Sequence, residues 1–406
     1  MWRCDPPTRL VVAVLVGLVA AAFGHPLVSL LAAIPWRPRA LLLAVALAAA
    51  LWGGMRVAAL QHRALVPGPI DGVVVVTGAP SGDRAVARVV AGREDVLLQA
   101  PGYRPQLGGI YRVTGRLREI DPPVRDYYAS QGVHLELRGS RLVWLADRGG
   151  GWGVIDDLHR DALRRLGADR DPPADRALVA GVTLGETGSL PADVRAEFRT
   201  SGLYHVVAVS GQNVALVVIF ALACLALLGV IGAPARVVAA GITITYVLVT
   251  GAGPSIVRAG VAGALVSVAW LASRPVARWH LLACGAAVVL ALNPLDLFNP
   301  GFQLSFAAVW AIFAVAPRLQ GSLGSAVAVS VACTLVTTPI AWWHFGRLAP
   351  LSVPANLLAL PAVGPLLGCG LSAILLGSVW PPLATPPLML ADLLAGYLLW
   401  VARLCS

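Results

Sequence analysis

The sequence contains no lysine: all 31 basic residues among its 406 are arginines. A phosphate-binding loop with a catalytic lysine and a Schiff-base enzyme both need that amine, so both are excluded. Charge is scarce as well, because charged residues make up 13% of the chain, against about a quarter in soluble domains. Hydrophobic residues make up 57%. This composition indicates a polytopic membrane protein.

Cysteine and histidine are few and scattered. The six cysteines stand singly in apolar stretches without a C-x-x-C pair, and the seven histidines are far apart in the sequence. Neither a disulfide framework nor a structural zinc site is expected from such spacing. We therefore expect no metal ion and no cofactor.

Acidic residues almost vanish from the second half of the chain. From Val206 onward only Asp296 and Asp392 are acidic, and we expect Asp392 to lie at headgroup level. Residues 61–201 instead alternate polar and apolar positions, as soluble domains do. The predicted domains are anchor spans at 1–60, a soluble domain at 61–147, an amphipathic helix and connector at 148–201, and a polytopic membrane domain at 202–406.

Long apolar segments flank the soluble part. Leu10–Ile34 and Ala40–Met55 are uncharged, and about 20 apolar residues cross a bilayer. The first could instead be a cleavable signal peptide, although no small-residue cleavage motif follows it. Eight more segments follow: Leu203–Val230, Ala235–Thr250, Ile256–Ala272, Trp279–Leu292, Phe302–Ala316, Leu323–Trp343, Leu351–Val379 and Leu383–Val401. Several contain polar residues or proline, and broken backbone at membrane depth indicates a wet pathway.

The soluble domain has the alternation of short β-strands. The expected strands are Val73–Thr77, Arg84–Val90, Val96–Gln99, Ile110–Leu117, His134–Leu137 and Arg141–Leu145. Five or six short strands predict a small barrel of the OB type. The predicted fold class is therefore a polytopic α-helical membrane protein with an inserted OB-like β-barrel.

Arginines alternate along two of these strands. A basic sheet face with nearby aromatic rings can follow the phosphates of single-stranded DNA and stack its bases. The alternative is an ordinary solvated sheet face. The candidate DNA-contacting residues are Arg84, Arg88, Tyr103, Tyr111, Arg112 and Arg116.

Helical spacing begins after the predicted barrel, in residues 152–170. Apolar residues such as Leu158 and Leu163 fall on one side, and charged residues such as Arg160 and Arg164 fall on the other. Such a helix can lie in the membrane interface with its arginines at the headgroups. Packing on the soluble domain is the alternative, and the membrane domain that follows favours the interfacial position.

The most informative stretch is residues 202–214, which read G-L-Y-H-V-V-A-V-S-G-Q-N-V. His205, Ser210, Gln212 and Asn213 put polar side chains into an apolar segment, where they are costly unless paired or hydrated. The stretch resembles the signature of the ComEC family, the inner-membrane DNA-uptake channel of natural competence, which reads G-L-x-H-L-x-A-x-S-G-x-H or S-G-x-N.

Further motifs in the same order carry the resemblance over nearly the whole chain. They are Gly181–Glu186, Leu190-Pro191, Phe198–Leu203, Gly251–Ala259, Asn293-Pro294, Gly301–Phe306, Thr338-Pro339 and Asn356, with Asp126-Tyr127-Tyr128 and Gln131-Gly132-Val133 in the soluble domain. The resemblance implies OB-like and competence membrane domains. The pathway residues it suggests are His205, Ser210, Gly211, Gln212, Asn213, Ser255, Arg258, Gln303, Ser305, Thr338 and Asn356.

Two features depart from the family pattern. Asn213 stands where many members have histidine, which favours a hydrogen-bonding or helix-breaking role over a proton relay. Many members also continue into a metallo-β-lactamase-like domain, whereas this sequence ends at Ser406 without an H-x-H-x-D-H motif. We therefore expect the C-terminal nuclease-like domain to be absent, either by truncation or because the member is short. We also expect no enzymatic activity.

Arg258 is open to two interpretations. It could reach the interface as an anchor, or face the bundle interior and contact passing phosphates bidentately. The expected function is a channel for single-stranded DNA across the cytoplasmic membrane during natural transformation. A solute transporter is the alternative, and an intramembrane serine hydrolase using Ser210 is a weaker one, because His205 is not on the same helix face.

The channel hypothesis implies several partners. Besides single-stranded DNA and membrane lipid, these are a DNA receptor, a separate nuclease and a cytoplasmic ATPase or helicase, because no motif for ATP hydrolysis is present. The arginine-bearing loop at Arg37 and Arg39 predicts a cytoplasmic side for that loop and an extracytoplasmic barrel. The number of subunits is left open.

Overall fold

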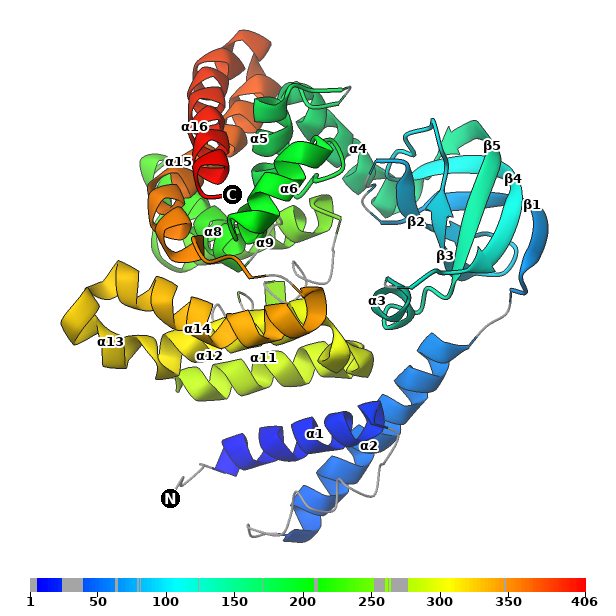
Figure 1. Ribbon diagram of the computed structural model, residues 1–406, viewed down its shortest axis with the longest axis horizontal. Helices are drawn as coiled ribbons and strands as arrows, with labels where there is room; N and C mark the ends of the chain where they lie inside the picture. The colour runs from blue at the N-terminus through cyan, green and yellow to red at the C-terminus, as the bar shows by residue number, and fades with distance from the viewer. Residues whose placement is uncertain are drawn as a thin grey trace.

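The computed structural model describes residues 6–23, 39–62, 65–78, 80, 82–122, 124–169, 171–207, 211–251, 260–261, 263, 277–346 and 348–406. Three of the expected pathway residues, Ser210, Ser255 and Arg258, lie outside these described residues, as does most of the expected span Ile256–Ala272. Figure 1 shows a small barrel beside a helical bundle, with a layer of helices and an N-terminal hairpin below the bundle.

The soluble domain is a closed five-stranded barrel with the strand order β1-β2-β3-β5-β4. Its β3 and β5 are parallel, and the other neighbours are antiparallel. The inserted OB-like barrel is confirmed. The strands are β1 (Gly68–Val76), β2 (Arg84–Val89), β3 (Glu94–Gln99), β4 (Gly109–Glu119) and β5 (Leu135–Asp147), and the short helix α3 (Arg125–Ala129) precedes β5.

The two last predicted strands are one strand, β5. The register between β4 and β5 shifts where Thr114 pairs with Arg141 and Gly115 pairs with Gly139, which leaves Ser140 as a bulge. This bulge interrupts the alternation of inward- and outward-facing residues by which a strand is recognised in a sequence. A Cβ atom on Gly115 would collide with the carbonyl of Arg138, so only glycine allows the strands this close approach.

The bundle packs eight α-helices around one core (Figure 1). They are α4 (Gly150–Arg165), α5 (Ala174–Leu184), α6 (Ala192–Thr200), α7 (Tyr204–Val207), α8 (Gly211–Leu227), α9 (Gly232–Val249), α15 (Ser352–Val379) and α16 (Thr385–Leu404), the last preceded by the 3-10 helix η3 (Pro381–Ala384). Leu178 of α5 and Phe198 of α6 are buried in the same core as Leu366 of α15 and Leu398 of α16. The connector expected at 148–201 is thus built into the bundle.

The lower layer and the hairpin complete the structure. The layer contains α11 (Arg278–Leu292), the 3-10 helix η2 (Pro294–Phe298), α12 (Pro300–Ala314), α13 (Ala316–Leu323) and α14 (Ser325–Phe345), and the hairpin contains α1 (Pro6–Ala22) and α2 (Arg39–Gln61). Two Asn-Pro pairs start helices here: the Asn293 side chain accepts from Leu295 N at 3.0 Å, and Asn299 accepts from Gly301 N at 2.8 Å. Proline has no backbone N–H, and at the first helical position that group would have no partner within the helix. Each Asn-Pro pair therefore favours the start of a helix at this point.

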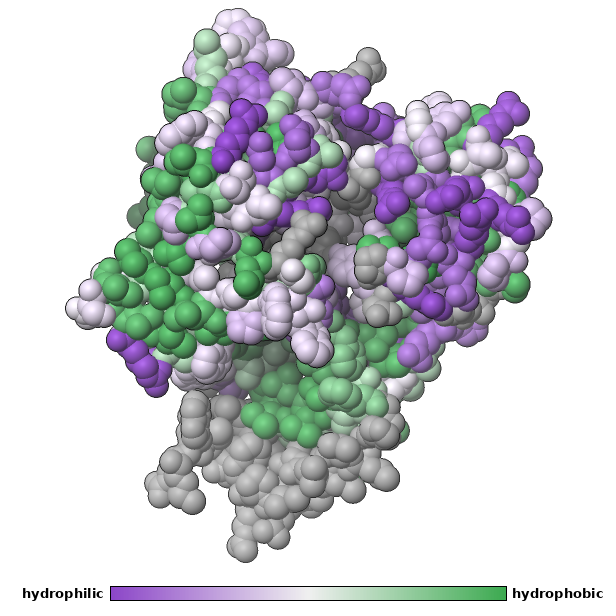
Figure 2. All heavy atoms as spheres, viewed as in Figure 1, coloured by the Kyte–Doolittle hydropathy of each residue, from purple (hydrophilic) through white to green (hydrophobic). Residues whose placement is uncertain are grey.

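Several helices are long and apolar enough to cross a membrane. Five qualify among the described residues: α2, α9, α14, α15 and α16 with η3. The pair α12 and α13 would make a sixth, bent by 57°. Figure 2 shows apolar surface concentrated over the lower layer, whereas the barrel surface is largely hydrophilic. The chain is therefore a polytopic α-helical membrane protein.

The helix α4 packs as an ordinary structural helix on its apolar side. Ala162 and Leu166 are buried in the bundle core, and Leu163 packs against it. The polar residues Asp156 and His159 are buried as well, while Val154 and Leu158 are exposed. The C-terminal half of its apolar side is thus covered by the bundle, whereas the N-terminal half stays uncovered.

Asp392 is part of an ion pair within the bundle. Its carboxylate contacts Arg176 of α5 at 2.6 Å through two nitrogens, and Arg176 also donates to Leu166 O at 3.0 Å. A bidentate pair fixes orientation as well as charge. It therefore joins α16, α5 and the end of α4.

Close packing of α5 against α15 yields a stability prediction. A Cβ atom on Gly370 would collide with the hydroxyl of Thr183, so we expect Gly370→Ala to destabilise the protein by about 1–3 kcal/mol. In the control Gly364→Ala the new methyl meets Leu216 at an ordinary 3.6 Å. That variant should be neutral or gain up to about 1 kcal/mol from helix propensity. Thermal unfolding in detergent measures both; equal effects would contradict the packing argument.

Candidate DNA interface and membrane pathway

The barrel is fixed to the helical part on several sides. Arg148 pairs with the buried Asp156 of α4, and His134 contacts the Leu60 carbonyl at the end of α2 at 2.7 Å. The Asn293 amide donates to Ser130 O at 2.7 Å. These contacts bring together the family motifs around residues 131–133 and 293–294.

The four predicted arginines are all exposed on the outside of the barrel, but they differ in partners. Arg88 forms a bidentate ion pair with Asp95 at 2.8 and 2.9 Å, and Arg112 lies 3.7 Å from Asp71. Among the described residues, no ion pair engages Arg84 or Arg116. Two of the four predicted arginines, Arg88 and Arg112, therefore already have a carboxylate nearby that offsets their charge.

The two tyrosines predicted to stack on bases differ in exposure. Tyr103 is exposed in the loop after β3. Tyr111 is 8% exposed, packs in the barrel core and accepts a hydrogen bond from Gln106 N at 3.0 Å. Its ring cannot stack on a base, because odd-numbered residues of this part of β4 point inward. The prediction for Tyr111 is therefore wrong.

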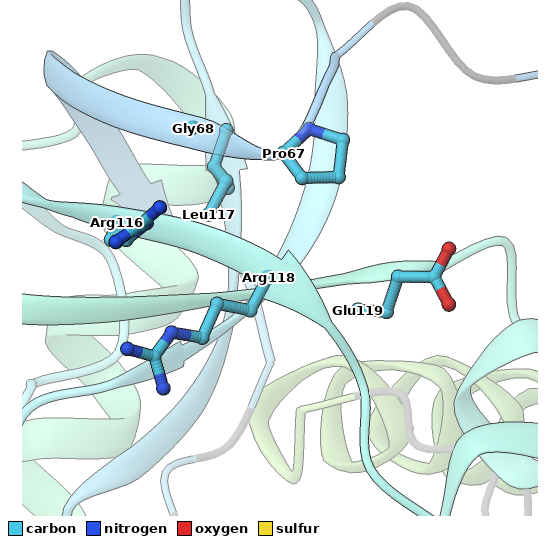
Figure 3. Close-up of a pocket in the computed structure, with 6 residues that line it drawn as sticks. All are labelled: Pro67, Gly68, Arg116, Leu117, Arg118 and Glu119. Atoms are coloured by element: carbon cyan, nitrogen blue, oxygen red, sulfur yellow. The ribbon is translucent and has the colours of Figure 1, made fainter.

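A shallow, open pocket of about 450 Å³ lies where β1 begins and β4 ends. Arg116 and Arg118 line it together with Glu119 and the chain at Pro67 and Gly68. Figure 3 shows the two guanidinium groups on one side of the pocket and Glu119 directed away from them. Two guanidinium groups beside an open cavity suit a phosphate group.

Part of the expected pathway set lies where α7 meets the start of α15. A Cβ atom on Gly202 would lie 2.7 Å from the Cβ of Ser352, and the His205 ring contacts Gly202 O at 3.0 Å. Asn356 follows Ser352 by one helical turn, so it lies on the same side of α15. Two stretches distant in sequence, the signature and the start of α15 with Asn356, therefore meet here.

The neighbouring residues Gln212 and Asn213 have different roles. Asn213 is 1% exposed, and its amide donates to the Val182 carbonyl at 2.9 Å in the last turn of α5. The Tyr246 hydroxyl donates to the next carbonyl, Thr183 O, at 3.0 Å. Asn213 is thus a structural cap for a buried helix end, whereas Gly211 and Gln212 are exposed at the start of α8.

A second group of expected pathway residues lies on α12 and α14. The Gln303 amide donates to Leu297 O at 2.9 Å, and its oxygen lies 2.8 Å from His344 Nε2. Ser305 is exposed on α12, and Thr338 is half-buried on α14 beside Pro339. The described pathway residues therefore lie in three places: at α7–α15, at the start of α8, and on α12 and α14.

Glu186 is a buried acid that forms no ion pair with any arginine in the part of the chain that the structure describes. It is 9% exposed in the loop between α5 and α6, and its oxygen accepts from Gly188 N at 3.1 Å. Burial raises the pKa of this carboxyl to about 7, an effect only partly offset by the Gly188 hydrogen bond. A Cβ atom on Gly188 would lie 2.7 Å from Pro80 O, so this loop packs against the barrel between β1 and β2.

Sequence reasoning missed three residues on the barrel surface. Arg138 and Arg118 are exposed beside Arg116, and Tyr127 is 41% exposed on α3. Arg118 continues the alternation of Arg112 and Arg116, so that signal was present. Arg138 could not be found from local alternation, because the bulge at Ser140 hides the period of β5.

The family model described as "Competence protein" matches residues 182–406, more than half of the chain. The chain belongs to this competence protein family. It is 30% identical to the competence protein ComA of Neisseria gonorrhoeae over 88% of this chain, 31% identical to ComE operon protein 3 of Bacillus subtilis (strain 168) over 47%, and 27% identical to the uncharacterized protein YcaI of Escherichia coli (strain K12) over 51%. No solved structure matches significantly.

The chain spans 56%, 25% and 30% of the lengths of these three family members, respectively. The family match begins at Val182, inside α5. It therefore covers the end of α5 and the later helices, which hold the described pathway residues. The barrel lies outside the matched residues.

The buried carboxyl of Glu186 yields a pH prediction. Because its pKa in the folded protein, about 7, exceeds the ordinary value of 4.5, ionisation costs stability as pH rises from about 4.5 through 7. We expect Glu186→Gln to be more stable than the wild type by about 2–3 kcal/mol at pH 8 and equally stable near pH 4.5. Thermal unfolding across that range measures it, and Glu186→Asp should keep the pH dependence. A pH-independent difference would contradict the assignment.

Proposed function

We propose that this protein is a membrane channel for single-stranded DNA in natural transformation, with its barrel receiving the strand. Membership in the competence family supports a role in DNA uptake. The observation that carries the channel is the exposed Gln212 at the start of α8, in the same signature stretch as Gly202 and His205. A polar side chain exposed in an apolar bundle needs a wet neighbourhood, as a polyanion does.

The energy source and the strand-degrading nuclease belong to partners in this proposal. A cytoplasmic ATPase or helicase, a DNA receptor and a separate nuclease fit the absence of any such motif in the given sequence. The barrel is proposed to be extracytoplasmic, because incoming DNA reaches that side first. Anionic phosphates and arginine side chains then provide the attraction.

The two neighbouring residues of the signature provide the test. Gln212→Leu should lower DNase-protected DNA in cells at least about tenfold while protein level and surface-bound DNA stay normal, because it removes only an exposed polar group. Asn213→Leu should instead lower the protein level, because Val182 O then loses a buried hydrogen-bond partner worth about 1–3 kcal/mol.

Two controls separate the alternatives. Gln320→Leu removes an exposed glutamine from α13, which holds none of the expected pathway residues, and should leave DNA uptake unchanged. Ser210→Ala should reduce uptake only partly, whereas loss of a catalytic nucleophile abolishes turnover. Normal DNA uptake by Gln212→Leu would contradict the channel assignment, and labelling of Ser210 by a serine-reactive probe would favour the hydrolase.

A further inference from the structure

Three arginines from three different strands form one row across the outside of the barrel. Strand register pairs Arg84 with Gln99, Gln99 with Arg138, and Arg138 with Arg116. Paired residues on neighbouring strands share one face of a sheet. The three arginines are exposed, and the Arg138 guanidinium donates to the Gln99 side chain at 3.2 and 3.3 Å. The row therefore runs β2-β3-β5-β4.

The row arginines have fewer acidic partners than several neighbouring arginines. Arg84 and Arg116 take part in no ion pair among the described residues, and Arg138 lies 4.0 Å from Glu136, whose side chain is largely buried. Arg88, Arg112 and Arg125 each have an acidic partner within 3.7 Å. The row arginines therefore keep more of their positive charge than these three, and the exposed Arg118 and Arg141 on β4 and β5 likewise have no ion pair among the described residues.

The two ends of the row lead to different parts of the molecule. Arg116 lines the open pocket with Arg118 on the outer side of the barrel (Figure 3). Arg84 lies two residues after Gly82, whose backbone lies against Gly188 of the bundle. Figure 1 shows β2 and β3 on the side of the barrel facing the bundle and β4 on the far side. The row connects solvent to the bundle.

An aromatic ring lies near the bundle end of the row. Tyr127 is 41% exposed and packs edge-on against Tyr128, with ring centroids 5.3 Å apart. Tyr128 packs against the same apolar cluster as Val86, which lies two residues after Arg84 on β2. An exposed ring beside guanidinium groups can stack a base whose phosphates those groups hold.

We propose that incoming single-stranded DNA follows this arginine row from the Arg116–Arg118 pocket to the α5–α6 loop of the bundle. The proposal rests on the proposed function and specifies its path. Neighbouring strands are about 4.8 Å apart, so the row is about 14 Å long around the barrel wall. It covers three of the five strand-to-strand steps of the barrel. A flexible polyanion can follow such a curved row, whereas a flat bilayer cannot touch both ends.

Two triple variants of the full-length protein in detergent test the path. The row variant changes Arg84, Arg116 and Arg138 to Gln, and the matched control changes the ion-paired Arg88, Arg112 and Arg125 to Gln, so both lose three charges. Binding of a fluorescent oligothymidylate is measured against salt. Because each lost phosphate contact in single strands lowers the log–log slope by about 0.7, the row variant should lose about 2 and the control much less.

A third variant and a competition complete the test. Changing the same three row residues to Lys keeps the charge and should retain most of the slope, which separates charge loss from misfolding. Equal effects of the two Gln variants, or no binding of the strand by wild type at low salt, would overturn the path. Displacement of the strand by anionic phospholipid vesicles through the same three arginines would make the row a lipid-contact surface and also overturn it. Failure of the channel itself is measured separately, by DNase-protected DNA in cells.

Discussion

Backbone carbonyls at helix C-termini must find donors, and in an apolar protein water does not supply them. Here side chains from distant elements do so. Asn213 and Tyr246 cap α5, Trp52 and Arg56 of α2 cap Ala291 O and Leu292 O of α11, and His159 of α4 contacts Val249 O at the end of α9. Each contact joins two elements that hydrophobic packing alone would leave free to slide.

This constraint also places the barrel. His134 of the barrel domain contacts the Leu60 carbonyl at the end of α2. This contact caps the helix and also attaches the barrel to it. The carbonyl of Val249 can only accept, so His159 presents its Nδ1 proton. Burial lowers the pKa of this imidazole, and the hydrogen bond to Val249 offsets part of that effect. The neighbouring Asp156 is neutralised by Arg148 at the end of β5. The helix α4 therefore joins the barrel to the bundle through buried polar contacts.

The same pattern separates structure from function in the signature stretch. A polar residue in an apolar helix is either a cap for a buried carbonyl, as Asn213 is, or exposed to a wet region, as Gln212 is. The two residues are adjacent and chemically alike, and only their surroundings distinguish them. On the barrel, likewise, Arg88 and Arg84 lie on one face of one strand, but only Arg88 has a carboxylate partner in register, Asp95.

The sequence by itself determined the membrane class, the order of spans around a soluble insert, the OB-like barrel and the family, because hydropathy, period and motif order are local properties of the chain. It could not decide which polar residues meet, because that depends on contacts between distant segments. The bulge at Ser140 concealed β5 and with it Arg138, and the closure of the barrel turned Tyr111 inward. Strands β3 and β5 are far apart in the sequence, and their pairing aligns Arg84, Arg138 and Arg116 into one row. Only the tertiary structure could show this alignment.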